Sequence, residues 1–574
     1  SYGPPLLVGS LSLTVYFLTL APSVVSGIDA PALQYFPYRL LIPHTGYPLY
    51  ILLGWVWTHL FAWGELAFRM NLLSAIYAAA AVAVLYKILL VVGRSHLASA
   101  TGALIFALTP TFWSQAIITE VYTLHLLLLS LLLYQLLLWR EGQAELWHLA
   151  LVYGLGLTHH RLTLLYGPLL LVAVLMVKGR TWRDKKALAA LLLPLLLYLY
   201  VPIRGTQLFG WSRVATLGTV RYIAGLGATE SLHLRGDVTF LTRWVQEMSL
   251  IVLVVAAVGW AFLLYKDRWL ALLLTSLLAV SLLFNISYQI PDIEPYFIPE
   301  YFFLSIFAGL GMAAASQAVQ SVSPGRTLKA VGLIVLVGLY LHLAHQWSQT
   351  WPRVDMSGAT ELRDRSMATL LSMPPHAVLA AEHNTAVPAQ YLHRGVGIRP
   401  DVEVILMNHP WQPDATQALL ERAEAGHIVY VDRLVSRVDA RFVVEEKPGW
   451  WKIGLATDSQ PQVPLDLALN PNVRLVGYDL SGDRLVFYWK VEQPFDRPYS
   501  IFTHYFGPGG EFLGQGDKGE GEYPNELATF PTTQWQVGQI IRDYYHLPKG
   551  TTLVKFGFYR VDEARYGEAE LTLR

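Results

Sequence analysis

Cysteine is absent from the 574-residue sequence, and charged residues make up only 15% of it. Without cysteine the chain has no disulfide, no thiol nucleophile and no Cys-type metal site. Hydrophobic residues reach 54%, far more than a soluble protein of this size carries, which indicates a polytopic membrane protein. The 42 basic and 42 acidic residues balance, so the net charge gives no reason to expect binding to nucleic acid.

Long apolar runs are also absent after about residue 350. No uncharged run there approaches the roughly 20 residues that a membrane-spanning helix needs. We therefore predict a membrane domain over residues 1–348, followed by a soluble part large enough for one or two small domains. The first apolar segment lacks a basic n-region and a small-residue cleavage site, so we expect a retained span and not a signal peptide.

Twelve apolar segments are candidates for crossing the membrane. They cover residues 5–22, 48–63, 70–93, 97–109, 117–139, 147–158, 162–178, 186–203, 246–265, 269–287, 299–318 and 327–347. The short loops rich in Lys and Arg lie at 87–94, 139–142, 177–186, 265–268 and 323–329. The positive-inside rule places these loops in the cytoplasm, and alternation then puts 110–116, 158–161, 204–245, 288–298 and everything after residue 348 outside. If the chain starts inside, as we expect, the loop 23–47 is outside as well.

The segment 48–63 does not fit this alternation as a crossing. It is short for a span and holds three tryptophans and a histidine, a content that suits a helix lying in the membrane interface. We therefore predict about eleven crossings, with one long outer loop over 23–69. The alternative is a twelfth crossing with the N-terminus outside.

Ionisable and aromatic side chains gather on the predicted outer face. The candidate site residues are Asp29, His44, Tyr47, Glu120, His159, His160, Arg161, Arg204, Asp292 and Tyr296. Ionisable groups at membrane depth are costly and usually functional, so their convergence predicts a site at the membrane–water boundary. Each also has a structural explanation, since acids stabilise helix starts or turns and arginines snorkel to the interface. No strict ligand spacing supports a metal site built from the histidines and acids.

Several motifs carry a resemblance to a known family. In chain order they are "PHTGYPLYILLG", "FRMNLLSA", "FWSQAIITEVYTLH", "GLTHHRL", "YVPIRG" and "IPDIEPYFIP". The sequence resembles the membrane glycosyltransferase-like family labelled domain of unknown function 2723, which is related to protein O-mannosyltransferases and belongs to the GT-C class. The resemblance implies a GT-C-like polytopic α-helical membrane domain whose first outer loop contains interfacial helices and an acid near its start.

One position departs from the family pattern. Family members commonly carry a glutamate three residues after the aspartate, where this sequence has Ala32. Three alternatives stay open. Asp29 alone suffices, or a second carboxylate comes from Glu120 or Asp292, or this member has altered activity. The last alternative includes a non-catalytic accessory subunit that works with partner chains in a membrane complex.

The resemblance implies transfer of a mannose-like sugar from a polyprenyl-phosphate donor to an acceptor hydroxyl, on protein Ser/Thr or a glycan, outside a bacterial-type plasma membrane. Asp29 is the candidate base, because a partly desolvated carboxylate is the better base. Arg161 and Arg204 suit the leaving phosphate, with hydrogen bonds from His159 or His160. No cofactor is required by this chemistry, and a divalent metal is the weaker alternative. A transporter is disfavoured, because the charged residues cluster on one face and no inverted repeat is found.

The soluble part shows two patterns, both expected outside the cell. In residues 349–460, "HAVLAAEHN", "VEVILMN" and "GHIVYVD" are typical of short strands and "ATQALLERAEAG" of a helix, which predicts a small α/β domain with a parallel sheet. No glycine-rich phosphate loop is present there. Residues 461–574 alternate over seven or eight short runs, which predicts a jelly-roll-like β-sandwich. Trp489, Tyr505 and Trp535 are candidates for stacking on sugars, with core positions as the alternative.

Overall fold

The structure is a computed structural model in which the chain forms two compact units, Ser1–Asp364 and Arg365–Arg574. It describes residues 3–27, 30–43, 46–177, 184–209, 239–288, 290, 292–321, 326–407, 415–432, 437–447, 449–456, 460–518, 532–560 and 563–573. Two candidate site residues, Asp29 and His44, lie outside the described residues.

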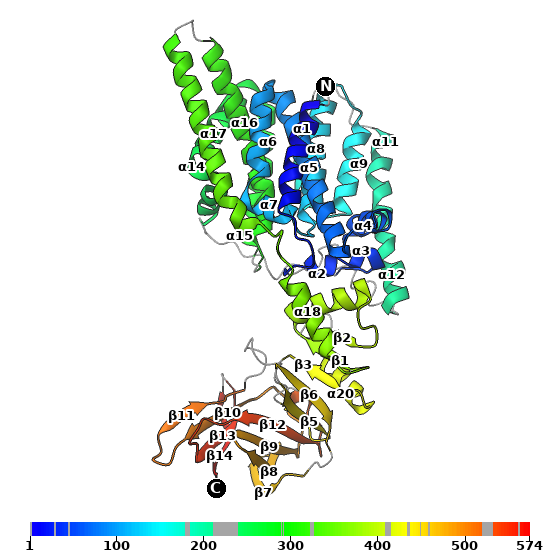
Figure 1. The fold of residues 1–574 in the computed structure, drawn as a ribbon, viewed down its shortest axis with the longest axis vertical. Coiled ribbons are helices and arrows are strands. Elements are labelled where there is room, and N and C mark those ends of the chain that lie inside the picture. The colour runs from blue at the N-terminus through cyan, green and yellow to red at the C-terminus, as the bar shows by residue number, and fades with distance from the viewer. Residues whose placement is uncertain are drawn as a thin grey trace. The chain divides into compact units, whose positions relative to one another are not determined.

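The first unit is a bundle of apolar helices (Figure 1). Its long helices are α1 (Gly3–Leu18), α5 (Leu66–Gly93), α6 (His96–Ala107), α8 (Tyr122–Arg140), α9 (Leu146–Leu157), α10 (Leu162–Met176), α11 (Lys185–Leu192), α12 (Tyr200–Phe209), α14 (Thr239–Lys266), α15 (Arg268–Ser287), α16 (Ile298–Ser321) and α17 (Arg326–Val354). The short elements are α2 (Ala30–Leu33), α3 (Phe36–Arg39), α4 (Pro48–Leu60), α7 (Pro110–Ala116), η1 (Leu193–Leu199) and η3 (Glu294–Phe297). Helix α18 (Glu361–Ser372) contains the boundary between the two units.

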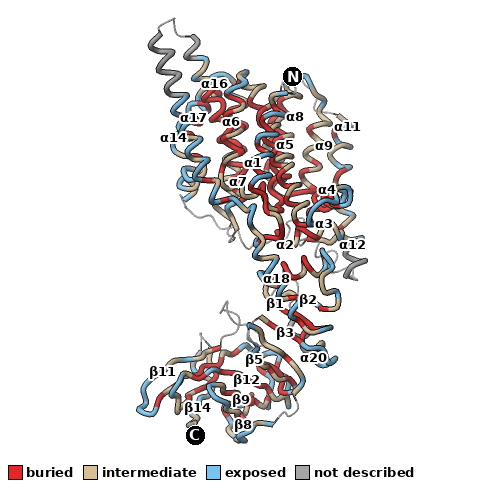
Figure 2. The backbone as a smooth tube through the Cα atoms, viewed as in Figure 1, coloured by how far each residue is buried: buried red, intermediate tan, exposed pale blue. Residues whose placement is uncertain are grey.

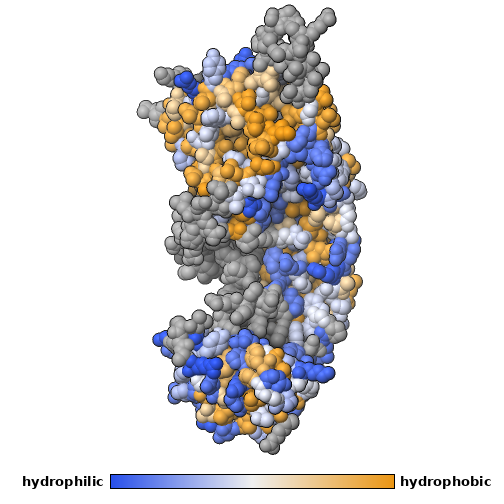
Figure 3. Space-filling model, turned by 90° about the vertical axis from the view of Figure 1, so that its left-hand side faces the viewer, coloured by the Kyte–Doolittle hydropathy of each residue, from blue (hydrophilic) through white to orange (hydrophobic). Residues whose placement is uncertain are grey.

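By length and composition, six helical segments in the described part of the chain can cross a membrane. The number rises to seven if the bent pair α6 and α7 counts as one span, and α1, α9 and α10 are shorter apolar helices. The predicted polytopic membrane region is thereby confirmed, while the count of eleven crossings stays a prediction. Leu250, Val254 and Val258 are exposed at a spacing of four residues along α14, as expected for a lipid-facing stripe. Figure 3 shows such hydrophobic side chains over the surface of this unit.

Helices α2, α3 and α4 lie at the end of the bundle opposite the N-terminus, near α12 (Figure 1). Helix α4 has 13 residues, or about 20 Å at 1.5 Å per residue, which is short of a bilayer core of about 30 Å. Its tryptophan Trp55 and its last residue Leu60 are 38% and 81% exposed. These features agree with the predicted interfacial helix.

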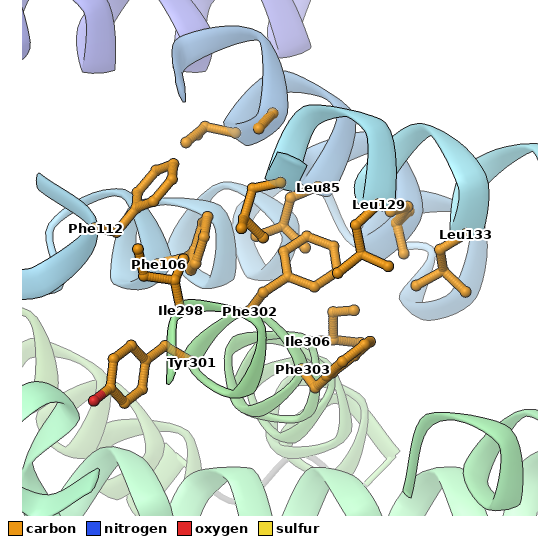
Figure 4. Packing of buried hydrophobic residues seen from close by; sticks show 14 of the residues in the cluster. Leu85, Phe106, Phe112, Leu129, Leu133, Ile298, Tyr301, Phe302, Phe303 and Ile306 are labelled. Atoms are coloured by element: carbon orange, nitrogen blue, oxygen red, sulfur yellow. The ribbon is translucent and has the colours of Figure 1, made fainter. Parts of the chain in front are cut away.

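Helix α16 forms the centre of the core, and Figure 2 shows α5, α6, α8 and α16 as its most buried elements. The side chain of Phe302 in α16 points among Leu85 of α5, Phe106 of α6 and Leu129 of α8 (Figure 4). The rings of Phe106 and Phe302 are 5.5 Å apart in an edge-on arrangement. Large rings from one helix thus fill the space between three others.

Two glycines bring the backbones of α14 and α16 into direct contact. A Cβ atom on Gly259 would lie 1.8 Å from the carbonyl oxygen of Phe307, and one on Gly311 would lie 2.1 Å from that of Val255. A side chain at either position therefore requires the helices to separate.

Gly259→Ala is expected to lower the stability of the folded protein by about 3 kcal/mol, at the upper end of the cost of overpacking a core. The measurement is thermal unfolding of the full chain in detergent. Gly338→Ala in α17 is the matched control, because a Cβ there meets nothing within 4 Å, and Ala is the better helix former. An unchanged melting temperature for Gly259→Ala would contradict the close contact of the two helices.

The second unit contains a mixed five-stranded sheet in the order β2-β1-β3-β6-β5. Its strands are β1 (Val378–Ala381), β2 (Glu403–Leu406), β3 (Val429–Val431), β5 (Phe442–Lys447) and β6 (Trp450–Leu455). Strand β1 pairs in parallel with β2 and β3, and β6 pairs antiparallel with β3 and β5. Helix α20 (Ala415–Glu424) lies between β2 and β3 in the chain, where the helical pattern predicts it.

Two further antiparallel sheets follow, in the orders β4-β12-β9-β8-β7 and β11-β10-β13-β14. Their strands are β4 (Arg437–Asp439), β7 (Val463–Asn470), β8 (Val473–Ser481), β9 (Arg484–Val491), β10 (Ser500–Phe506), β11 (Phe512–Gln515), β12 (Ile540–His546), β13 (Leu553–Arg560) and β14 (Glu563–Thr572). Side chains from both sheets form one core. Strand β4 comes before the predicted boundary at 460/461 but pairs with β12. The domain boundaries themselves stay a prediction.

The aromatic residues proposed to stack on sugars lie in this core. Trp489, Tyr505 and Trp535 are 0%, 2% and 3% exposed, so the stacking hypothesis is wrong for these three side chains. Alternation along a strand shows which residues share a face, but it does not show which face is covered by the second sheet.

Candidate functional site

Four of the candidate residues lie together in a cluster of rings at one end of the bundle. The ring of Tyr47 stacks on that of His160 at 5.8 Å and lies 6.0 Å from that of His159. The ring of Tyr296 is 6.1 Å from His160 and 5.6 Å from Tyr122. These five residues, with Tyr50, His125 and Tyr166, are called the ring cluster below.

Hydrogen bonds between backbone segments set the position of the cluster. The amide of Leu49 in the first turn of α4 donates to the carbonyl of Thr158 at 3.3 Å, which joins α4 to the turn 158–161. His159 Nε2 lies 2.8 Å from the carbonyl oxygen of Val121, next to the first residue of α8. Tyr47, just before α4, has a left-handed backbone with φ of 37°, a strained conformation for a residue other than glycine. The turn 158–161 is therefore held by α4 on one side and α8 on the other.

The two histidines of the turn are neutral at ordinary pH. They lie between α9 and α10, outside the apolar helices, and are 2% and 4% exposed. Burial lowers the pKa of both His159 and His160, because the charged imidazole loses its hydration. Neighbouring His125 and Arg161 also lower the pKa of His160. The pair thus offers hydrogen bonds without positive charge.

The two candidate acids that the structure describes lie near the cluster. Glu120 is 6% exposed and its amide donates to Ser74 Oγ at 3.3 Å. Its carboxylate interacts electrostatically with Tyr50 and Tyr122, and Asp292 interacts with Tyr122 as well. Both carboxylates therefore lie close enough to Tyr122 to interact with it.

The two candidate arginines differ in their surroundings. Arg161 directly follows His160 and interacts electrostatically with it and with Tyr198. Arg204 donates from Nε to the carbonyl of Leu40 at 3.1 Å and from Nη2 to that of Arg39 at 3.2 Å. It thus holds the C-terminal end of α3, where a cation is favoured by the helix dipole. A role of either arginine in binding phosphate stays a prediction.

Asn71 is a polar residue near the site that sequence reasoning missed. Its Nδ2 donates to the carbonyl of Ala21 at 2.8 Å, and its Oδ1 accepts from Gln34 Nε2 at 3.0 Å and from Thr119 Oγ1 at 2.6 Å. One side chain therefore joins the segment after α1, the residue after α2 and the residue before Glu120. The only signal was a lone amide in the apolar run of "FRMNLLSA".

Glu300 and His125 were missed as well, because each is an ionisable residue inside a largely apolar helix, although His125 ends the motif "FWSQAIITEVYTLH". Glu300 is fully buried and accepts from Trp244 Nε1 at 2.7 Å and from Asn285 Nδ2 at 2.8 Å. Asn285 Nδ2 also donates to the carbonyl of Tyr296 at 2.9 Å, so this network fixes η3 and its tyrosine. The ring of His125 in α8 is 4.9 Å from that of His160.

Metal binding gains no support from the site geometry. Within the described ranges, no group of three or more His, Asp or Glu side chains is arranged to hold a metal ion. His44, one of the proposed ligands, lies outside those ranges.

The region that carries most of the site residues has recognisable relatives. Residues 29–183 match the family described as the protein O-mannosyl-transferase TMEM260 N-terminal domain. The predicted resemblance to a family related to protein O-mannosyltransferases is thus confirmed. The matched TMEM260 range includes Asp29, Tyr47, Glu120, His160 and Arg161.

Two curated TMEM260 proteins match a longer part of the chain. Protein O-mannosyl-transferase TMEM260 of Mus musculus is 25% identical over 449 residues, which cover 69% of this chain and 62% of the relative. The protein of the same name in Dictyostelium discoideum is 22% identical over 494 residues, covering 72% and 59%. This chain therefore spans about three fifths of the length of the TMEM260 relatives.

Among solved structures, ArnT from Cupriavidus metallidurans bound to undecaprenyl phosphate is similar with a TM-score of 0.46 and 13% identity, over 79% of this chain and 99% of that chain. The mycobacterial arabinofuranosyltransferase AftD is similar with a TM-score of 0.46 and 10% identity, over 100% of this chain and 62% of that chain. These TM-scores are too low to establish a shared fold.

Proposed function

We propose that this protein is a membrane glycosyltransferase. It moves a mannose-like sugar from a polyprenyl-phosphate donor to an acceptor hydroxyl, on a protein Ser/Thr or a glycan, at the outer face of the membrane. The observation that carries this proposal is the match of residues 29–183 to the N-terminal domain of a protein O-mannosyl-transferase. The ring cluster adds support, because several of its residues come from that range and lie together.

The reaction assigns a task to each candidate residue. Asp29 takes the proton from the acceptor hydroxyl, whose oxygen bonds to the anomeric carbon of the donor. The bond between that carbon and the phosphate oxygen breaks, and its electron pair leaves with the polyprenyl phosphate. Arg161 and Arg204 offset the charge of this leaving group, because guanidinium groups bind phosphate oxygens in pairs and stay charged. Attack from the side opposite the phosphate inverts the anomeric carbon.

A lipid-linked donor suits the surroundings of the site. Tyr47 and Tyr122 of the ring cluster are packed into the apolar core of the bundle, and Tyr296 lies against it. A sugar attached to a prenyl chain enters such a site from the bilayer, and the sequence holds no nucleotide-sugar motif. The polyprenyl chain therefore serves as the anchor of the substrate, and no cofactor is needed.

The test is transfer of labelled mannose from its polyprenyl phosphate to hydroxyl acceptors by the purified full chain. Labelled product that forms only with intact protein would support the proposal. A second candidate is an accessory subunit without activity, favoured by Ala32 in place of the family's glutamate. Failure to bind the donor and to transfer sugar to any acceptor would favour this second candidate.

Membrane topology gives a further prediction, and the absence of cysteine makes it simple to measure. With eleven crossings, Arg39 in α3 lies outside, whereas a crossing α4 would place it inside. A single Arg39→Cys substitution is expected to react with a membrane-impermeant maleimide in intact cells. Glu141→Cys, in the loop after α8, is expected to react only after permeabilisation in either topology and is the matched control. Labelling of Arg39→Cys only after permeabilisation would establish the twelve-crossing alternative.

A further inference from the structure

Four nitrogen atoms in the ring cluster are buried without a hydrogen-bond partner among the residues that the structure describes. They are Nδ1 and Nε2 of His125, Nδ1 of His159 and Nε2 of His160. The three side chains are 1%, 2% and 4% exposed. A buried polar atom that lacks a partner is costly, and such atoms are rare in native proteins unless a ligand, an ion or water satisfies them. Three such rings in one place indicate a binding surface.

The existing hydrogen bonds fix the proton positions on two of these rings. His159 Nε2 lies 2.8 Å from the carbonyl oxygen of Val121, and since a carbonyl only accepts, Nε2 carries the hydrogen. Nδ1 of the neutral ring is then an acceptor. His160 Nδ1 accepts from the amide of Leu162 at 3.3 Å, so its Nε2 carries the hydrogen and is a donor. Neutral His125 adds one donor and one acceptor.

These nitrogens include both hydrogen-bond donors and hydrogen-bond acceptors. This mixture indicates which part of the sugar-carrying lipid they can bind, its phosphate or its sugar. A phosphate oxygen only accepts hydrogen bonds, so the lone pair on His159 Nδ1 would repel it. A hydroxyl both donates and accepts, so it can bond to His159 Nδ1, to His160 Nε2 and to either nitrogen of His125. The flat ring of Tyr47, stacked on His160 at an angle of 16°, adds an apolar wall of the kind that packs against a sugar.

Resting on the proposed function, we infer that His125, His159 and His160 bind the hydroxyl groups of the donor's sugar, and that the phosphate is left to the arginines. Arg161 follows His160 directly in the chain, so the charged group is held next to the neutral surface. The ligand class is a neutral polyhydroxyl group attached to a lipid phosphate. The proposed reaction gives no other task to His125, so this residue tests the sugar-binding role directly.

The experiment compares two lipids, polyprenyl phosphate alone and polyprenyl phosphate carrying mannose, bound to the full chain in detergent. His125→Leu is expected to weaken binding of the mannosyl lipid by about tenfold or more, because it removes two hydrogen-bonding atoms. Binding of the lipid without sugar is expected to stay unchanged. Arg161→Gln should weaken both lipids, and His345→Leu, an exposed histidine of α17, should affect neither.

Melting temperature separates binding from a structural role. His125→Leu removes two buried nitrogens without partners, so the lipid-free protein should melt at the same temperature or about 2–4 °C higher. A lower melting temperature, or an equal loss of both lipids, would overturn the inference, as would unchanged binding of the mannosyl lipid. If the unaltered chain binds neither lipid, the proposed function fails instead. His125→Gln, which retains a donor and an acceptor, should recover part of the lost affinity.

Discussion

Asp29→Asn is expected to slow sugar transfer by about 10²–10⁴-fold, the usual contribution of a general base. The amide keeps the size of the side chain but cannot take a proton from the acceptor hydroxyl. Asp29 stands directly before α2, at the first residue of the TMEM260 match. The measurement is the initial rate with labelled mannosyl polyprenyl phosphate, with donor binding measured in parallel, because loss of a base lowers the rate without weakening the donor.

Three companion variants make this result specific. Asp355→Asn changes an acid after α17 that accepts from the amide of Ser357 at 2.9 Å, and it should leave transfer unchanged. Glu120→Gln and Asp292→Asn test the two alternative carboxylates. Equal transfer by Asp29→Asn and the unaltered protein would remove Asp29 as the base. A large loss of transfer in only one of the variants Glu120→Gln and Asp292→Asn would then assign the role of base to that residue.

Lys518→Met is expected to destabilise the β-rich unit by about 3–5 kcal/mol, because it leaves a buried charge without its partner. The carboxylate of Asp543 is fully buried and receives Lys518 Nζ at 2.7 Å. Trp489 Nε1 and the hydroxyl of Tyr545 donate to its other oxygen, at 3.2 and 2.5 Å. Arg437 Nε lies 3.6 Å from the oxygen that Lys518 contacts, so after the substitution only this longer ion pair remains. Hydrogen exchange of β9 and β12 in the full chain measures the loss locally.

The control for this prediction is an exposed ion pair in the same sheet. Arg474 pairs with Asp466, and their side chains are 36% and 78% exposed. Arg474→Ala should cost less than about 1 kcal/mol, as solvent screens such pairs. Adding Asp543→Leu to Lys518→Met should not restore the stability, because it leaves the buried guanidinium of Arg437 without its carboxylate. A Lys518→Met protein as stable as Arg474→Ala would show that the buried pair contributes little.

Helices and strands could be predicted from the sequence where a single local pattern of apolar residues identifies them. The strands at β1, β2 and β3 and the helix α20 follow from short apolar runs and one amphipathic segment. The antiparallel strands β5 and β6 that extend this sheet were not predicted, and neither was the pairing of β4 with β12. Strands β4 and β12 are about 100 residues apart, and such partners are chosen by the packing of side chains, which leaves no local signal. Strands β5 and β6 are neighbours in sequence and were simply missed.

Some residues of the candidate site could be predicted from the sequence and others could not. Tyr47, the His159–His160 turn and Tyr296 were identified because they lie in motifs at the ends of spans, and the structure brings them together. His125 and Asn71 also lie in motifs, but like Glu300 they are inside largely apolar helices, where the sequence does not say which face meets a partner. Arg204 was singled out for phosphate binding, which stays a prediction, while its contacts with the end of α3 could not be predicted from the sequence.

The side-chain amide of Asn71 restricts how nearby segments of the chain can move. It makes hydrogen bonds to three separate segments of the chain, at Ala21 after α1, at Gln34 after α2 and at Thr119. Sliding any of these segments past the others would strand a buried amide group at a cost of about 1–3 kcal/mol. Asp29 lies five residues before Gln34, and Glu120 directly follows Thr119. One buried amide therefore links the end of α2 to the segment that precedes Glu120.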